Sequence, residues 1–167
     1  MGREVRRVPK DWQHPKNEHG HYIPLYDGAD FSRQVKEWDE GAAKWAEGLR
    51  DDWSGGWTPL EDDEKDMTFE DWCGPRPEAK DYMPEWPERD RTHLMMYEDT
   101  SEGTPISPAF ETPEELARWL ADNNASAFAD MTATYEQWLS MCKQGWAPSM
   151  IGDSKGLRSG VEAMSEA

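Results

Sequence analysis

The chain has 167 residues and a formal net charge of −17 at pH 7, and apolar residues make up only 36% of it. This length suits one domain with a hydrophobic core, so we expect a single domain spanning residues 1–167. The excess of carboxylates argues against binding to nucleic acid or to anionic membranes, because both depend on Lys and Arg. Ten Trp residues supply enough apolar area to predict a folded protein.

The negative charge is concentrated in the middle of the chain. Residues 37–136 contain 27 Asp or Glu and 8 Lys or Arg, a net charge of −19, whereas residues 1–36 carry +2 and residues 137–167 carry zero. Such a field attracts a basic partner. The only basic cluster is too small to bind nucleic acid against this field; it consists of Arg3, Arg6, Arg7 and Lys10.

Cysteine usage and hydropathy predict the compartment. The two cysteines, Cys73 and Cys142, form no CxxC pair, which argues against a disulfide framework or a Cys-based zinc site and favours a reducing cytosol. No apolar run approaches membrane-spanning length, and the N-terminal residues lack the apolar core of a signal peptide. We therefore expect a cytoplasmic protein.

The first half of the chain contains one long amphipathic helix. Residues 3–8 alternate weakly and predict a short strand that Pro9 closes. Apolar residues at spacings of three and four then predict a helix over residues 31–50, with Asp30 as its N-cap. We expect this stripe to be a buried core face, although a partner-binding face remains an alternative. The stripe consists of Phe31, Val35, Trp38, Ala42, Trp45 and Leu49.

Residues 51–91 form an acidic region rich in Trp, Pro and Gly. Its composition is typical of loops, except that Thr68 has the position to cap one helical turn. The spacing of Trp53, Trp57, Trp72 and Trp86 indicates that this loop is anchored to the core. Its carboxylates would then be held in fixed positions, although a merely solvated loop is the alternative.

The second half carries the clearest local signals. Residues 92–97 predict a strand, and Thr112 with Glu115 forms a capping box for a helix that ends at residues 122–124. A further helix begins at Thr132 or Thr134 and ends at Gly145, and we expect Phe128 to plug the core between these two helices. Residues 149–151 and 157–161 predict a β-hairpin with a loop of about five residues, and residues 162–167 should fray. The predicted class is α+β, a small antiparallel sheet with about three packed helices and long Trp-rich loops.

No catalytic motif is present, so we expect a protein that is not an enzyme and needs no cofactor. His19 and His21 lie in a loop without a helical partner, which makes a metal site improbable. Cys142 lies on the apolar face of a predicted helix, where an inert buried thiol is expected. The sequence therefore predicts no catalytic residue and no metal ligand.

Four segments resemble a group of small acidic proteins encoded by tailed bacteriophages and prophages. They are residues 3–9 (REVRRVP), 97–108 (YEDTSEGTPISP), 112–124 (TPEELARWLADNN) and 132–139 (TATYEQWL). The group has no assigned activity, so the resemblance transfers no functional residue. It implies a host bacterial cytoplasm and a genome that uses small acidic proteins to disable host defences.

These observations lead to one functional hypothesis and two alternatives. We expect a binding protein that inhibits a basic, nucleic-acid-binding host defence protein, such as a CRISPR–Cas effector, because fixed carboxylates can mimic a phosphate backbone. The alternatives are a phage structural, assembly or housekeeping factor, and a small enzyme without a recognisable motif. The candidate partner-binding residues are Asp51, Asp52, Glu61, Asp62, Asp63, Glu64, Asp66, Glu70 and Asp71.

Overall fold

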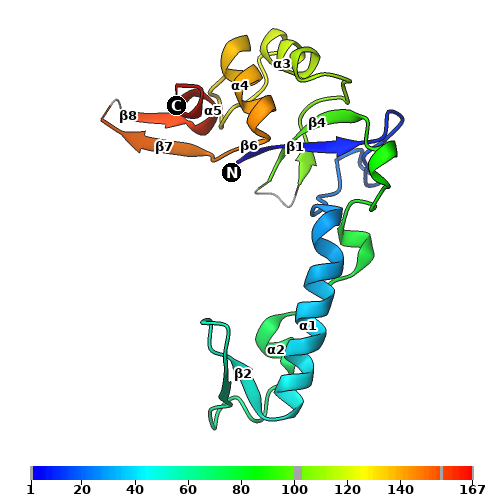
Figure 1. The fold of residues 1–167 in the computed structure, drawn as a ribbon, viewed down its shortest axis with the longest axis vertical. Helices are drawn as coiled ribbons and strands as arrows, with labels where there is room; N and C mark the ends of the chain where they lie inside the picture. The colour runs from blue at the N-terminus through cyan, green and yellow to red at the C-terminus, as the bar shows by residue number, and fades with distance from the viewer. Residues whose placement is uncertain (1, 100–102, 155, 167) are drawn as a thin grey trace. The chain divides into compact units, whose positions relative to one another are not determined.

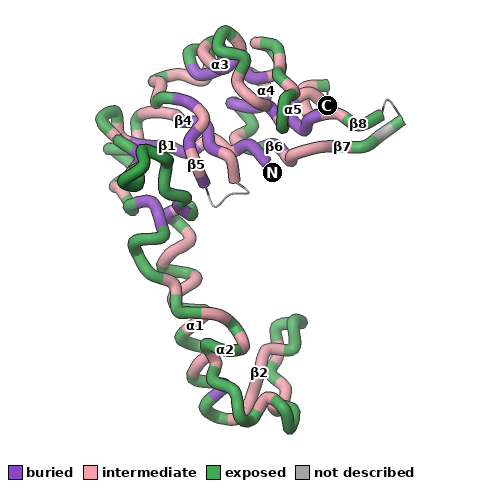
Figure 2. Tube along the Cα trace, turned by 180° about the vertical axis from the view of Figure 1, so that it is seen from behind, coloured by how far each residue is buried: buried purple, intermediate pink, exposed green. Residues whose placement is uncertain are grey.

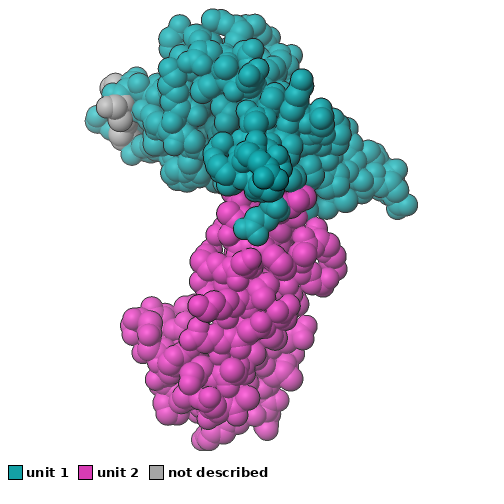
Figure 3. Space-filling view, turned by 45° about the vertical axis from the view of Figure 1, so that its right-hand side comes forward, with its two compact units in different colours: residues 1–25, 85–167 teal, residues 26–84 magenta. Residues whose placement is uncertain are grey.

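The computed structural model describes residues 2–99, 103–154 and 156–166. Its contacts divide the chain into two compact units, which Figure 3 colours separately. Unit 1 contains residues 1–25 and 85–167, and unit 2 contains residues 26–84. The chain length predicted a single domain of residues 1–167, and this division into two compact units does not test that prediction.

Unit 1 is built on a four-stranded sheet with the order β5-β4-β1-β6 (Figure 1). The central strands β1 (Arg3–Val8) and β4 (His93–Glu98) pair antiparallel along their whole length, with Arg3 opposite Glu98. Short strands β5 (Thr104–Pro105) and β6 (Trp146–Ala147) extend the sheet on either side. The antiparallel sheet confirms the predicted α+β class and both predicted central strands.

Alternation along β4 separates two sides of the sheet. Met96 is fully buried in the helical core, and Leu94 packs partly buried against it. Met95 and Tyr97 are also buried, but the Tyr97 hydroxyl contacts Trp12 and His14 of the segment before residue 25, as well as Met95. The period of two along a strand explains this division. The buried core on the helical side consists of Met96, Leu116, Ala117, Leu120, Ala127, Trp138, Met141, Cys142, Ala147 and Val161.

The two main helices of unit 1 begin and end where their local signals predict. Helix α3 (Pro113–Asp122) starts with a capping box between Thr112 and Glu115, and α4 (Tyr135–Gln144) starts with one between Thr134 and Gln137. Gly145 ends α4 in the left-handed conformation at φ 90°, which glycine adopts without steric cost. The helices contact each other closely over the sheet (Figure 1).

Two predictions for unit 1 are wrong. Phe128 is only half-buried, and the fully buried residue of this connection is Ala127. The connection is a tight turn, in which the backbone N–H of Ala127 donates to the carbonyl of Met131 at 2.8 Å, and this turn places Ala127 in the buried core in place of Phe128.

The C-terminal residues also differ from the predicted frayed tail. The hairpin of β7 (Met150–Asp153) and β8 (Gly156–Ser159) is confirmed, although Lys155 of its loop lies outside the described residues. Helix α5 (Gly160–Met164) follows it, with the Ser159 side chain accepting from the Glu162 N–H. Met164 packs against the core, so burial orders the tail as far as this residue, while Ala167 at its end lies outside the described residues. A short 3-10 helix, η3 (Glu88–Asp90), precedes β4.

Unit 2 is a long helix covered by short elements. Helix α1 (Phe31–Ala46) follows the 3-10 helix η1 (Gly28–Asp30) and leads into a hairpin of β2 (Leu49–Asp51) and β3 (Trp57–Pro59). Helix α2 (Phe69–Cys73) and the 3-10 helix η2 (Ala79–Asp81) complete it. Thr68 caps α2 as predicted, whereas the hairpin was not predicted.

The predicted helix of residues 31–50 needs two corrections at its ends. Gly48 has φ +82°, a conformation that ends the helix early and sends Leu49 into β2. At the start, Asp30 makes no side-chain capping hydrogen bond. Asp27 instead accepts from the Ala29 N–H at 3.0 Å and caps η1, while Asp30 pairs with Arg33 at 2.8 Å.

The apolar stripe of α1 is also less buried than expected. Of its six residues only Trp45 is buried, at 8% exposure, and the other five are half-buried. Figure 2 shows few buried positions in unit 2. The reason is size, because a unit this small buries a lower fraction of its surface. Side chains from α2 cover the stripe only partly, through ring contacts of Trp38 with Phe69 and of Trp45 with Trp72.

Candidate partner-binding surface

Two of the nine candidate carboxylates shape the tip of the β2–β3 hairpin. Asp51 accepts from the Trp53 N–H at 2.7 Å, and Asp52 accepts from the N–H groups of Ser54 and Gly56, both at 2.9 Å. Hydrogen bonds from the Ser54 side chain and from these N–H groups lower the pKa of Asp52. The tip is therefore a defined turn that holds Trp53 at φ 64° with 79% of its surface exposed.

A second group of candidates is neutralised by ion pairs. Arg50 lies 2.6 Å from a carboxylate oxygen of Glu61 and 3.0 Å from one of Glu64. Asp62 lies 2.6 Å from the ammonium group of Lys65. Glu64, which is 14% exposed, also accepts from the Glu61 N–H at 2.8 Å. These carboxylates hold the turn together and present less net charge to a partner than the sequence suggests.

The remaining candidates present their charge to solvent. Asp63, Asp66 and Glu70 are exposed, and none forms an ion pair within the described parts of the chain. Asp71 completes the capping box of α2 by accepting from the hydroxyl and N–H of Thr68, and these bonds lower its pKa. The structure thus places all nine candidates in unit 2 but gives them different roles, and three of them are best suited to meet a partner.

An aromatic pocket lies beside these carboxylates. It has a volume of about 310 Å³ and is lined by residues of α1, the hairpin and α2. Five of its lining residues are the aromatic side chains Trp38, Trp53, Trp57, Phe69 and Trp72. The spacing of Trp53, Trp57 and Trp72 in the sequence indicates an anchored loop but does not predict a pocket. Its one local signal is the spacing of three between Phe69 and Trp72, which puts both on one face of α2.

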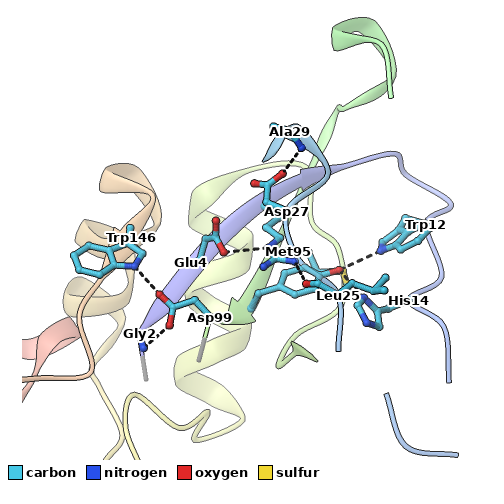
Figure 4. A network of polar contacts seen from close by, with 12 residues as sticks. Gly2, Glu4, Trp12, His14, Leu25, Asp27, Ala29, Met95, Asp99 and Trp146 are labelled. Atoms are coloured by element: carbon cyan, nitrogen blue, oxygen red, sulfur yellow. Dashed lines mark hydrogen bonds and ion pairs between the residues drawn. The ribbon is translucent and has the colours of Figure 1, made fainter. Parts of the chain in front are cut away.

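A network of polar contacts in unit 1 includes Trp12, His14 and Met95 (Figure 4). These three side chains surround the Tyr97 hydroxyl. The Trp12 indole N–H donates to this oxygen at 3.1 Å, and His14 Nδ1 lies 3.1 Å from it. His14 Nε2 lies 2.7 Å from the Ile23 carbonyl, which can only accept. His14 therefore carries its proton on Nε2, and the Tyr97 hydroxyl donates to Nδ1.

His14 and Tyr97 are both engaged within this network. Both ring nitrogens of His14 are engaged, and burial raises the pKa of Tyr97 to about 12. Cys142 is buried in the core as predicted, and burial raises the pKa of its thiol to about 12 as well. A pocket of about 560 Å³ lies beside His14, but these groups act as structural members of the core.

His14 predicts how stability depends on pH. Burial, and to a lesser degree the Arg6 charge, lowers the pKa of His14 against the opposing effect of the Ile23 carbonyl. The unfolded chain then binds a proton near pH 6.5, about the ordinary value, while the folded chain does not. Stability is complete above this pH and falls as the pH drops below it.

We expect the melting temperature to decrease between about pH 7.5 and pH 5.5. The His14→Gln variant should lose this dependence, because an amide can keep both hydrogen bonds without titrating there. Replacement of the exposed residues His19 and His21, which lie outside this network, provides the control variants. Equal pH profiles for the wild type and His14→Gln would contradict the assignment.

Comparison with protein-family models, curated proteins and solved structures finds no match for this chain. Within residues 2–99, 103–154 and 156–166, no helix is long and apolar enough to cross a bilayer. The same described residues contain no group of three or more His, Cys, Asp or Glu side chains arranged to hold a metal ion. Fold and surface together define an α+β protein with an ordered acidic and aromatic surface in unit 2.

Proposed function

We propose that this chain is a non-enzymatic binding protein that uses the acidic surface of unit 2 to occupy a basic partner protein. The observation that carries the proposal is the ordering of this charge. Residues 26–84 contain seventeen Asp or Glu and seven Lys or Arg, a net charge of −10, and hydrogen bonds and ion pairs fix the backbone that presents it. An ordered surface loses less conformational entropy on binding than a solvated loop does.

The partner that this surface fits best is a nucleic-acid-binding protein of the host bacterium, such as a CRISPR–Cas effector. Lys and Arg side chains that line a nucleic-acid channel are attracted to carboxylates as they are to phosphates. The resemblance to phage-encoded proteins supports a defence-related target in the host cytoplasm. An enzymatic role receives less support, because the two groups with strongly raised pKa values, the Tyr97 hydroxyl and the Cys142 thiol, are buried side chains of unit 1.

The choice of variants for the test depends on which carboxylates already form ion pairs within unit 2. Neutralising Glu64 would release the charge of Arg50, so the informative variant changes the three unpaired residues, Asp63→Asn, Asp66→Asn and Glu70→Gln. A control variant with the same change in net charge alters three exposed carboxylates of unit 1. The control substitutions are Glu111→Gln, Asp122→Asn and Asp130→Asn.

The experiment is affinity capture from bacterial lysate on the immobilised wild-type protein and on the two variants. We expect the wild type and the unit 1 control to retain the same basic protein, and duplex DNA or RNA to elute it. The unit 2 variant should retain much less. Equal retention on all three columns, or retention of no basic protein on any of them, would contradict the proposed function.

A further inference from the structure

The pocket of unit 2 has walls of aromatic rings that touch one another in series. The ring centroids of Trp38 and Phe69 are 5.1 Å apart, those of Phe69 and Trp72 are 6.1 Å apart, and those of Trp72 and Trp53 are 5.8 Å apart. The faces of such rings carry the negative part of the aromatic quadrupole. A chain of rings around a cavity of about 310 Å³ is therefore suited to a cation.

A glycine in α1 permits this wall to stand close to the helix. A Cβ atom at Gly41, which is buried and lines the pocket, would lie 2.4 Å from the Phe69 ring. Any other residue would thus displace Phe69 and alter the pocket, although alanine has the higher helix propensity. Gly41 thus lowers the helix propensity of α1 at the position where the Phe69 ring packs against the helix.

Trp53 is the least stabilising member of the wall. It leaves 79% of its surface exposed and has φ 64°, a conformation that is uncommon for large side chains. Asp51 and Asp52 hold the turn that imposes this conformation. Folding gains little from an exposed ring on a strained backbone, whereas a ligand that covers the ring would gain apolar contact.

The charges around the pocket also favour a cationic ligand. Its charged lining residues are Glu37, Arg50 and Asp51, and the single cation among them is already paired with Glu61 and Glu64. Glu37 is paired with Arg33, while Asp51 forms no ion pair within the described parts of the chain. Asp51 is therefore the carboxylate that remains to meet a positive charge.

We infer that this pocket receives an arginine side chain of the basic partner, an inference that rests on the proposed function. A guanidinium group stacks on aromatic faces and binds a carboxylate through two parallel N–H donors, whereas a lysine ammonium group is a point charge with stronger hydration. Trp53 supplies the stacking face and Asp51 the carboxylate. A phosphate-bearing ligand would be repelled by the same surroundings.

The test uses argininamide as the probe and citrullinamide, its uncharged isostere, as the control, both at constant ionic strength. Binding is followed in the full-length protein through the NMR signals of the indole N–H groups. We expect argininamide to shift the signals of Trp38, Trp53, Trp57 and Trp72 in a saturable manner and citrullinamide to leave them in place. Equal shifts with both probes, or no saturable shift, would overturn the inference.

Two variants locate the binding. Trp53→Ala and Asp51→Asn should each weaken argininamide binding by roughly three- to tenfold, in the range of an exposed cation–π contact or charge-assisted hydrogen bond. Trp146→Ala, which removes an exposed Trp of unit 1, is the matched control and should bind normally. Melting curves of all variants verify folding. Unchanged affinity in folded Trp53→Ala would place the probe elsewhere and overturn the inference.

The same probe separates this inference from the proposed function. The triple variant of Asp63, Asp66 and Glu70 should bind argininamide normally, because these residues do not line the pocket. The wild type could retain a basic host protein without binding argininamide. This result would refute the arginine site in the pocket and leave the proposed function standing. Saturable argininamide binding without retention of any basic protein would refute the proposed function and keep a guanidinium site.

Discussion

Replacement of Trp138 with alanine is expected to lower the free energy of unfolding by about 3–5 kcal/mol, the usual cost of deleting a large core side chain. Trp138 is fully buried in α4 and is the largest of the fully buried side chains. Truncation would leave a cavity between α4 and the other elements of the core. The surrounding side chains would move into this cavity only in part, because the core is closely packed.

The indole N–H of Trp138 adds a second expectation. It has no hydrogen-bond partner among the residues that the structure describes, and a buried unpaired donor costs about 1–3 kcal/mol. Trp138→Phe removes this donor while keeping most of the ring, so it should lose much less stability than Trp138→Ala. Urea unfolding of both variants, followed by circular dichroism, measures the difference.

Trp38 provides the comparison for this measurement. It is half-buried, and its indole N–H donates to the Gly74 carbonyl at 3.0 Å. Trp38→Ala should therefore cost only about 2 kcal/mol from partial burial and one hydrogen bond. Equal losses for Trp38→Ala and Trp138→Ala would contradict the assignment of the main core to unit 1.

The second large effect is expected on association with the partner. The variant that neutralises Asp63, Asp66 and Glu70 should associate roughly tenfold more slowly, because exposed charges act mainly by steering the encounter. Its dissociation rate should change little. The wild-type association rate should fall with rising salt, and the variant should show a weaker dependence on salt.

Stability should not account for this effect. Exposed charges contribute little to folding individually, and removal of like charges relieves repulsion. The variant should therefore melt at the wild-type temperature or slightly above it. The unit 1 control variant should keep most of the association rate, and an equal loss in both variants would show that only overall charge matters.

The parts of the fold that could be predicted are those that depend on neighbouring residues. The capping box at Thr112, the cap at Thr68 and the left-handed stop at Gly145 are local hydrogen-bond patterns that the sequence displays directly. The sequence left the start of α4 open between Thr132 and Thr134, and the structure places it at Thr134. The strands 3–8 and 92–97 were predicted because alternation identifies them without knowledge of their partners.

The parts that could not be predicted depend on what covers each segment. The stripe on α1 indicates a face, but its burial depends on the short elements that pack against it. The hairpin of β2 and β3 has only three residues per strand, too few to show a period. The aromatic pocket combines residues from α1, β2–β3 and α2, so no single segment contains its pattern.

The candidate carboxylates show the same division. Their number and sign were evident from the sequence, and these properties favour a basic partner. The pairing of Arg50 with Glu61 and Glu64 was not evident, because it joins residues eleven or more positions apart through the turn that they stabilise. Only the structure distinguishes carboxylates that hold the backbone from those that remain available to a partner.

A competition experiment on the captured partner tests whether the acidic surface of unit 2 occupies a nucleic-acid-binding site. The partner is immobilised, saturated with duplex DNA or with RNA, and then exposed to the wild-type protein at a fixed salt concentration. We expect mutually exclusive binding, with nucleic acid released as the protein binds, and weaker displacement by the variant of Asp63, Asp66 and Glu70. A stable ternary complex, with the variant as effective as the wild type, would contradict it.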